Sequence, residues 1–262
     1  MLKFIDTHTH LYDEVFNDER STIVERAKSN GLAACILPAI DKDSHRALLE
    51  CESNYSGYLY AASGLHPTSV KSDWESQLSF VFDEFSRREY VAVGEVGMDG
   101  YWSKEFLREQ AIVFKEQLKL AAGKDLPVIV HSRDSYEEIF EVLESCKSLN
   151  LKGVFHAFSG SPEIFRRIQK YGDFMAGIGG VITYKNAHIA ETVKQIGLNN
   201  IILETDSPWL TPAPFRGKRN EPSYIRYVAQ KIADITGTSE EEVAETTSAN
   251  AVKLFNLQQE KY

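Results

Sequence analysis

Histidine and acidic side chains recur along this chain at the ends of short apolar segments. They are His8, His10, His66, Glu95, His131, His156 and Asp206. A lone histidine after a strand usually satisfies itself by hydrogen bonding. Several such groups brought to one place would repel one another or take up protons unless a cation lay among them. The set therefore predicts a metal centre, provided that the fold brings its members together.

The residue types also indicate which ions this centre would hold. Imidazole nitrogens combined with carboxylate oxygens suit Zn²⁺, Mn²⁺, Fe²⁺, Ni²⁺ or a weakly held Mg²⁺. The set is larger than one tetrahedral catalytic ion needs, so we expect two divalent ions bridged by a carboxylate. Glu95 lies in the sequence between the two groups of histidines and is the natural bridge.

The elements that would position these residues are short segments rich in β-branched and apolar side chains. The apolar pattern predicts eight strands, at residues 3–10, 33–40, 58–65, 90–95, 127–131, 152–156, 173–178 and 201–206. Helical patterns lie between them, the clearest with Leu107, Ala111, Phe114, Leu118 and Ala121 on one stripe. Strict alternation predicts an α/β fold with parallel strands and outer helices. Eight strands favour a TIM-like (β/α)8 barrel over an open doubly wound sheet.

In such a barrel the C-terminal ends of all strands meet at one face, where active sites are assembled. Alternate side chains of a strand share a face, so His8 and His10 should point inward together with Asp6. The same rule puts Glu204 beside Asp206 and makes Glu204 a candidate for supporting the site. No linker or repeat divides the chain, so one domain is expected over residues 1–262.

Other titratable groups are expected to be structural. His45 and His188 fall within expected helices and should be exposed. The cysteines have no metal-binding spacing and should be buried free thiols; they are Cys35, Cys51 and Cys146. Ser239 with Glu242 fits the start of a last helix.

Composition and charge narrow the function further. With 43% hydrophobic and 26% charged residues, the chain has the composition of an ordinary globular protein. No apolar run is long enough to span a membrane, and the N-terminus lacks a signal pattern, which predicts a cytoplasmic location. The net charge of -9 argues against a protein that coats DNA. Neither a membrane nor an obligate protein partner is expected.

Seven sequence motifs resemble those of the TatD deoxyribonuclease family, within the amidohydrolase superfamily. In chain order they are THTH (7–10), GLHP (64–67), GEVGMD (94–99), PVIVHSRD (127–134), HAFSG (156–160), ETD (204–206) and RGKRNEP (216–222). Together they cover almost the whole chain. One departure is Gly100, where the family often carries an aromatic residue; Tyr101 and Trp102 follow it.

The resemblance implies a role for each of the candidate residues. The first ion would have the ligands His8, His10 and Asp206. The second would have His131 and His156, with Glu95 bridging the two. Asp206 would also deprotonate the attacking water, and His66 would contact the scissile phosphate.

Substrate contacts are expected from the loops at the mouth of the barrel. Basic residues that could meet phosphate, or could simply be solubilising charge, are Arg133, Arg216, Lys218 and Arg219. Trp209 could stack a base or pack under its loop. Without a basic stripe, the expected partner is a single-stranded or frayed DNA end, held transiently by an exonuclease.

Two other functions stay open at this point. The same metals could serve an amidohydrolase-type enzyme acting on a small amide, lactone or phosphate ester, because a fold does not fix the substrate. The basic RGKRN loop distinguishes the two, since a neutral small molecule would not need it. A noncatalytic metal-binding protein is less favoured, because an open metal site is a poor requirement for a scaffold.

Overall fold

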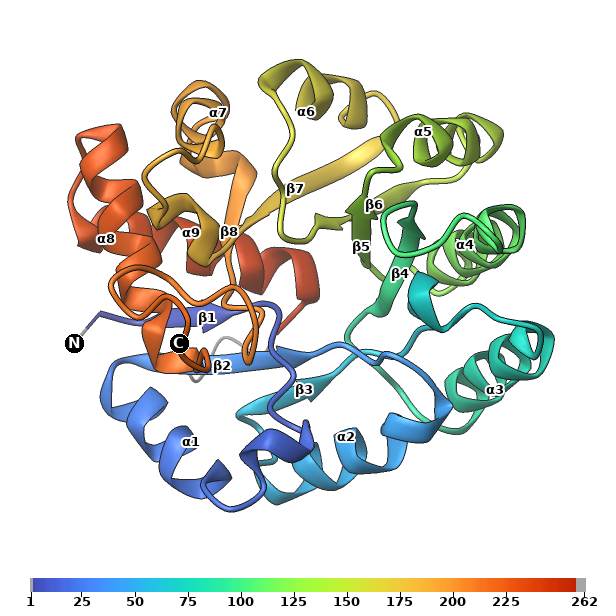
Figure 1. Cartoon of the computed structure of the whole chain (residues 1–262), viewed down its shortest axis with the longest axis horizontal. Helices are drawn as coiled ribbons and strands as arrows, with labels where there is room; N and C mark the ends of the chain where they lie inside the picture. Colours follow the sequence, from blue (N-terminus) through green and yellow to red (C-terminus); the bar gives the residue numbers. More distant parts are fainter. Residues whose placement is uncertain (1, 258–262) are drawn as a thin grey trace.

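Parallel strands alternate with helices through residues 2–257, the part of the chain that this computed structural model describes (Figure 1). The strands are β1 (Phe4–Asp6), β2 (Leu32–Leu37), β3 (Leu59–Ala61), β4 (Val93–Asp99), β5 (Val128–Arg133), β6 (Leu151–Phe155), β7 (Gly172–Ile178) and β8 (Ile201–Leu203). The α-helices are α1 (Arg20–Ser29), α2 (Lys42–Asn54), α3 (Trp74–Arg87), α4 (Leu107–Gly123), α5 (Tyr136–Ser145), α6 (Pro162–Ile168), α7 (Ile189–Ile196), α8 (Ile225–Thr236) and α9 (Glu240–Phe255). Short 3-10 helices are η1 (Glu14–Phe16), η2 (Pro67–Ser69), η3 (Gly180–Thr183), η4 (Leu198–Asn200) and η5 (Pro222–Tyr224).

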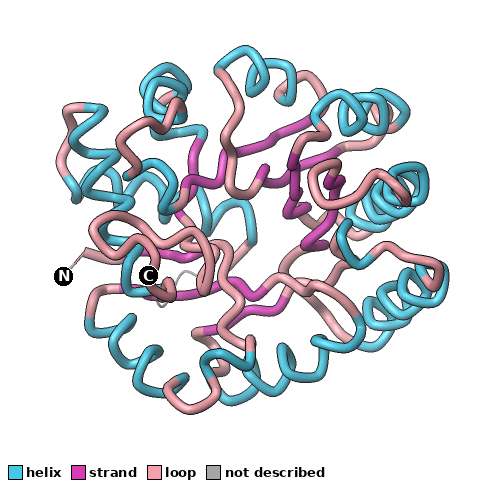
Figure 2. The backbone as a smooth tube through the Cα atoms, viewed as in Figure 1, coloured by secondary structure: helices cyan, strands magenta, loops and turns pink. Residues whose placement is uncertain are grey.

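The strands form a closed ring with most of the helices outside it, as Figure 2 shows. Regular pairing runs β1-β2-β3 and β4-β5-β6-β7-β8. One junction is a parallel bridge between Ser63 and Val93, and the other joins Thr9 to Ser207. At the second junction the Thr7 N–H also donates to the Leu203 carbonyl over 3.0 Å. The expected TIM-like (β/α)8 barrel is therefore confirmed.

The core has two parts because the side chains of each strand alternate between two faces. Phe4 packs in the layer between barrel and helices, whereas the next residue, Ile5, packs inside the barrel. Ile202 lies inside the barrel as expected, beneath the end of β8. Leu254 and Phe255 of α9 belong to the same inner cluster. The residues at the strand ends therefore lie above a packed barrel interior.

Several strand ends differ from the sequence prediction. β1 stops at Asp6, so His8 and His10 follow the strand instead of closing it. β8 stops at Leu203, and Asp206 has a left-handed φ of 56°, which an extended strand does not allow. β4 continues through Glu95 to Asp99 past an irregularity in its pairing with β5.

Among the structural expectations, the prediction that His45 is exposed was wrong. The side chain is buried between α2 and α3, with Nε2 2.9 Å from the Tyr90 hydroxyl and 3.2 Å from the Glu84 carboxylate. His188 is exposed as expected. The three cysteines are buried and free. No described helix is both long and apolar enough to cross a membrane.

The predicted helices are also present. The apolar stripe that begins at Leu107 lies on α4, and Ser135 immediately precedes α5. Ser239 caps α9 by accepting a hydrogen bond from the Glu242 N–H over 3.1 Å.

Candidate metal centre

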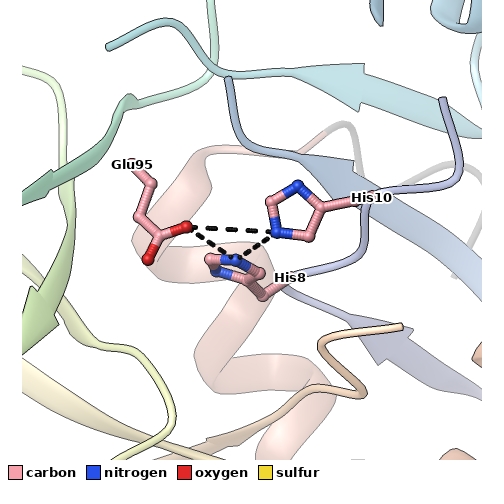
Figure 3. A group of neighbouring side chains, drawn as sticks. All are labelled: His8, His10 and Glu95. Atoms are coloured by element: carbon pink, nitrogen blue, oxygen red, sulfur yellow. Dashed lines mark hydrogen bonds and ion pairs between the residues drawn. The ribbon is translucent and has the colours of Figure 1, made fainter. Parts of the chain in front are cut away.

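The candidate ligands converge on one buried carboxylate, that of Glu95 in β4. Figure 3 shows His8 and His10 on one side of it. Its Oε2 lies 3.2 Å from His8 Nε2 and 4.0 Å from His10 Nε2. Its Oε1 lies 2.9 Å from His131 Nδ1 and 3.5 Å from His156 Nε2. Each oxygen thus faces a different group of histidines.

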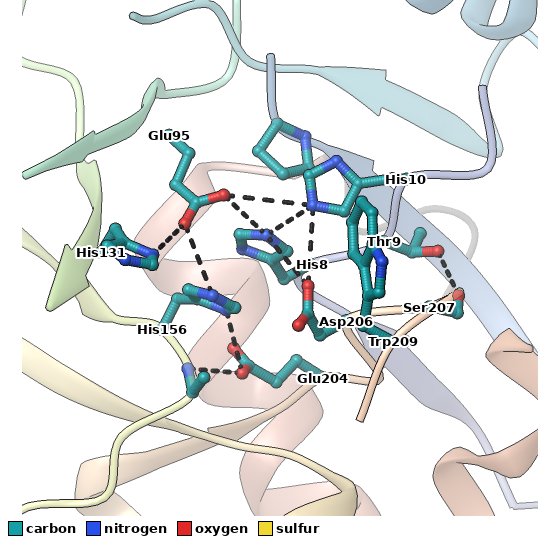
Figure 4. A network of polar contacts seen from close by, with 12 residues as sticks. His8, Thr9, His10, Glu95, His131, His156, Glu204, Asp206, Ser207 and Trp209 are labelled. Carbon is teal, nitrogen blue, oxygen red and sulfur yellow. Dashed lines mark hydrogen bonds and ion pairs between the residues drawn. The ribbon is translucent and has the colours of Figure 1, made fainter. Parts of the chain in front are cut away.

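Asp206 completes the first group (Figure 4). Its Oδ1 lies 3.6 Å from His10 Nε2 and 3.7 Å from His8 Nε2. The left-handed turn at Asp206 is held by its N–H, which donates to the His8 carbonyl over 2.8 Å. The chain after β1 and the chain after β8 are therefore tied together where their side chains meet.

The close approach of β4 and β5 depends on a glycine. Gly97 has a φ of 131°, and a Cβ at this position would collide with the backbone oxygen of His131. Only glycine adopts such a conformation readily. This contact brings Glu95 and His131, which come from neighbouring strands, to the same place.

Burial and charge together set the protonation of the cluster. Burial raises the pKa of Glu95, but contacts with the surrounding histidines, among them the charge of His156 and the hydrogen bond from His131, outweigh it and hold this pKa well below its usual range. Burial lowers the pKa of His8, which favours the neutral ring. An ionised carboxylate and a neutral imidazole are the forms that bind metal ions.

A hydrogen-bond chain fixes the tautomer of His10. The Tyr12 hydroxyl donates to the Pro38 carbonyl over 2.7 Å, because a carbonyl can only accept. The Tyr12 oxygen must then accept from His10 Nδ1–H, which lies 2.9 Å away. The proton on Nδ1 leaves a lone pair on His10 Nε2, and this atom lies 3.1 Å from His8 Nε2.

Carboxylates orient two further histidines by contacting the ring nitrogen that does not face Glu95. His156 Nδ1 lies 3.2 Å from Glu204 Oε1, which also accepts from the Ala157 N–H. Burial lowers the pKa of His156, but Glu204 and Glu95 outweigh it and raise this pKa to about 10, so His156 must release a proton when it binds a metal ion. His131 Nε2 lies 2.8 Å from Asp99 Oδ2. Glu204 is therefore placed to orient His156.

Tyr12 and Asp99 were not predicted as site residues. Asp99 lies four residues beyond Glu95 on β4, and strand alternation would have indicated it had the strand been read past Glu95. Tyr12 lies two residues beyond His10, in a segment that belongs to no strand. The sequence offers no comparable signal for it.

His66 lies close to the other group of histidines. Its Nε2 is 3.3 Å from Glu95 Oε1. Its Nδ1 accepts the Thr68 N–H over 3.2 Å, so a neutral ring carries its proton on Nε2. Burial lowers the pKa of His66, which favours that neutral ring. His66 thus presents an N–H donor to the space beside Glu95.

The donor set fits divalent cations. Two imidazole nitrogens bound to one ion at about 2.1 Å lie roughly 3 Å apart, close to the separation of the His8 and His10 Nε2 atoms. Within residues 2–257, Glu204 Oε2 is buried without a hydrogen-bond partner, as is His8 Nδ1. His8, His156 and Glu204 also have donor atoms close enough to share one ion.

The residues expected to contact substrate lie in different settings. Trp209 is 46% exposed, and its ring meets that of His10 edge-on at 4.9 Å. Arg216 is exposed over the Tyr184 ring, and Lys218 is exposed in the same loop. Arg219 is instead held by an ion pair of 2.9 Å with Glu19. This ion pair makes Arg219 less free than Arg216 and Lys218 to contact a substrate.

Comparison with known proteins assigns the chain to a family. The family model described as TatD related DNase matches residues 5–256. The chain belongs to the TatD-related DNase family. It is 37% identical over 253 residues to the uncharacterized metal-dependent hydrolase YabD of Bacillus subtilis, covering 96% of this chain and 98% of YabD.

Solved structures agree with this assignment. The crystal structure of YjjV, a TatD homolog from Escherichia coli K12, matches with a TM-score of 0.89 at 30% identity, covering 97% of this chain and 98% of YjjV. An amidohydrolase from Burkholderia multivorans with bound zinc shares the fold, with a TM-score of 0.64 at 10% identity over 98% of this chain and all of that one. This TatD-family chain is accordingly a metal-dependent hydrolase, with a buried cluster of histidine and glutamate side chains.

Proposed function

We propose that this TatD-family protein is a phosphodiesterase that cleaves DNA with two divalent ions bridged by Glu95. The proposal rests on the placement of the two oxygens of the Glu95 carboxylate, each of which faces a different group of histidines. Oε2 is 3.2 Å from His8, whereas Oε1 is 2.9 Å from His131. A carboxylate whose two oxygens face separate ligand groups is suited to bridge two ions.

The ligands of each ion follow from this placement of the two oxygens together with the family motifs. The first ion would be held by His8, His10 and Asp206. The second would be held by His131 and His156, with Glu95 shared. Mg²⁺, Mn²⁺ and Zn²⁺ are all compatible with such a set. When bound, divalent ions would polarise the phosphoryl oxygen and lower the pKa of water beside it.

The protein's own groups then position the reactants and move the proton. Burial raises the pKa of Asp206, but the hydrogen bond to His10 and the charge of His156 outweigh it and lower this pKa. The carboxylate is ionised at neutral pH and acts as the base that takes the proton from the attacking water. His66 donates from Nε2 to a phosphoryl oxygen, because its Nδ1 is occupied by the Thr68 N–H.

DNA is proposed as the substrate on three grounds. The matching family model is that of a DNase. Arg216 and Lys218 add exposed positive charge to the loop after β8. Trp209 in the same loop is half-exposed beside His10, where it could stack a base. The net charge of -9 favours a short, local contact such as a single-stranded or frayed end.

The test is a metal-reconstituted assay that compares single-stranded DNA, duplex DNA, RNA and small phosphate esters. We expect single-stranded DNA to be degraded from its ends. Hydrolysis of a small amide, lactone or phosphate ester with no cleavage of any nucleic acid would overturn the proposal and favour a small-molecule hydrolase. No hydrolysis of any substrate by metal-loaded protein would favour a noncatalytic metal-binding role.

A further inference from the structure

Two neighbouring aromatic side chains stand open to solvent in the loop that follows β4. Tyr101 is 53% exposed and Trp102 is 70% exposed, the most open large apolar side chain of residues 2–257. Their rings meet edge-on with centroids 5.1 Å apart. Paired aromatic surface that the fold leaves unburied indicates a binding surface more often than a single exposed residue does.

This loop is fixed to the metal centre by Asp99. Oδ1 of Asp99 accepts the N–H of Tyr101 over 3.0 Å and that of Trp102 over 3.1 Å. Its Oδ2 lies 2.8 Å from His131 Nε2. One carboxylate therefore holds both the candidate ligand and the two aromatic residues, so that their relative placement is set.

Local packing excludes a side chain from the position just before Tyr101. A Cβ added to Gly100 would lie 2.6 Å from the backbone oxygen of Asp134, so the loop has no room for a side chain there. The Gly100 N–H also donates to the Arg133 carbonyl over 2.8 Å. The next two residues are thus the first that can carry side chains outward.

Arg133 adds positive charge to the same surface. It pairs in register with Asp99 across β4 and β5. Its guanidinium carbon lies 3.6 Å from the centroid of the Tyr101 ring and 5.3 Å from that of the Trp102 ring. A planar cation stacked on aromatic rings can meet a phosphate while the rings meet a base.

A third exposed aromatic residue lies on the other side of the centre. Trp209 contacts His10, and His10 faces Oε2 of Glu95. The loop after β4 is instead held through His131, and His131 faces Oε1 of Glu95. Figure 4 shows His131 and Trp209 on opposite sides of Glu95. A strand that crosses the centre would meet aromatic surface both before and after the bridging carboxylate.

We propose that Tyr101, Trp102 and Arg133 form a stacking platform for unpaired bases next to the phosphodiester that is cleaved. The inference rests on the proposed function, because it takes the reacting phosphate to lie at Glu95. Bases of a duplex are already stacked on one another, so the platform selects single-stranded ends. Stacking on an aromatic face tolerates any base, and the platform therefore confers preference for strand state and not for sequence.

The direct test is binding of a short fluorescent oligothymidylate to metal-stripped protein in EDTA. We expect Trp102→Ala to raise Kd about tenfold, which is about 1.4 kcal/mol. Trp102→Phe should retain most of the affinity. Phe82→Ala is the matched control, since Phe82 is an aromatic residue of α3 that is 37% exposed and should leave Kd unchanged. Arg133→Ala should flatten the salt dependence of Kd by about one unit, whereas Trp102→Ala should not.

A second arm separates failure of the platform from failure of the proposed function. In metal-loaded enzyme, Trp102→Ala should raise KM for the single-stranded oligonucleotide and leave kcat for bis(p-nitrophenyl) phosphate unchanged. An unaltered Kd and KM in an enzyme that still degrades the oligonucleotide would overturn the platform alone. Binding that depends on Trp102, in a protein that hydrolyses no phosphodiester, would overturn the function and leave the platform standing. A dimer that Trp102→Ala dissociates, with Kd unchanged, would also overturn the platform, because it would assign this surface to contact between two copies.

Discussion

Replacing Asp206 by asparagine should remove catalysis while leaving the fold intact. Asparagine keeps the volume of the side chain and one oxygen that can bind a cation, but it has no basic carboxylate. Asp206 has a φ of 56°, and asparagine is among the few residues that tolerate this conformation. The backbone N–H that donates to the His8 carbonyl is unchanged. We therefore expect the loss to be confined to proton transfer.

The size of the loss follows from the role of the carboxylate. A positioned general base contributes roughly a hundred-fold to ten-thousand-fold to a rate, or about 3 to 5 kcal/mol in activation free energy. The side chain is 12% exposed and contacts His8 and His10, not the apolar core, so Tm should change little. Asp134→Asn is the matched control, because Asp134 is an exposed aspartate with a φ of 50° outside the cluster.

The assay is steady-state turnover of bis(p-nitrophenyl) phosphate and of single-stranded DNA, with bound metal measured on the same preparation. Turnover of Asp206→Asn within about threefold of wild type, with metal content unchanged, corresponds to less than 1 kcal/mol. Such a result would refute the assignment of Asp206 as the base. A comparable loss in Asp134→Asn would show instead that the substitution acts through the backbone.

Three further changes test other parts of the account. Tyr12→Phe leaves the Nδ1–H of His10 without its acceptor, so the affinity for metal should fall about 10- to 100-fold. A competition assay with a chelating dye measures this affinity, and an unchanged value would contradict the role given to the Tyr12 hydroxyl. Arg216→Ala and Lys218→Ala should each flatten the salt dependence of DNA binding by about one unit with little effect on a small phosphodiester; unchanged slopes would make them plain surface charge. Gly97→Ala should lower the free energy of unfolding, measured by urea denaturation, by about 3 kcal/mol or more, because the new Cβ meets the backbone of His131. A loss under about 1 kcal/mol would mean that β4 shifts to make room for the new methyl group.

The barrel could be predicted from the sequence because each strand carries a strong local signal. Alternating apolar segments and turn residues determine the order of strands, and histidines after strands then fall at one face. The exact ends could not be predicted, because they depend on pairing between distant segments. β1 and β8 end early where Thr9 meets Ser207, and Asp206 leaves the extended conformation there.

Some residues around the site could not be predicted from the sequence for the same physical reason. Asp99 was overlooked because β4 runs on past Glu95, where its pairing with β5 is irregular. Tyr12 reaches His10 only through the shape of the turn after β1, which no periodicity encodes. The helical pattern of residues around His45 predicts a surface position, and only the packing of α2 against α3 buries its side chain.

The central claim is that Glu95 bridges two ions, and anomalous diffraction from crystals loaded with Mn²⁺ or Zn²⁺ tests it most directly. We expect two adjacent anomalous peaks per chain, one beside His8 and His10 and the other beside His131 and His156, with one oxygen of Glu95 directed to each. Elemental analysis of the same protein should give two ions per chain. A single saturated peak that Glu95 does not coordinate would contradict the account.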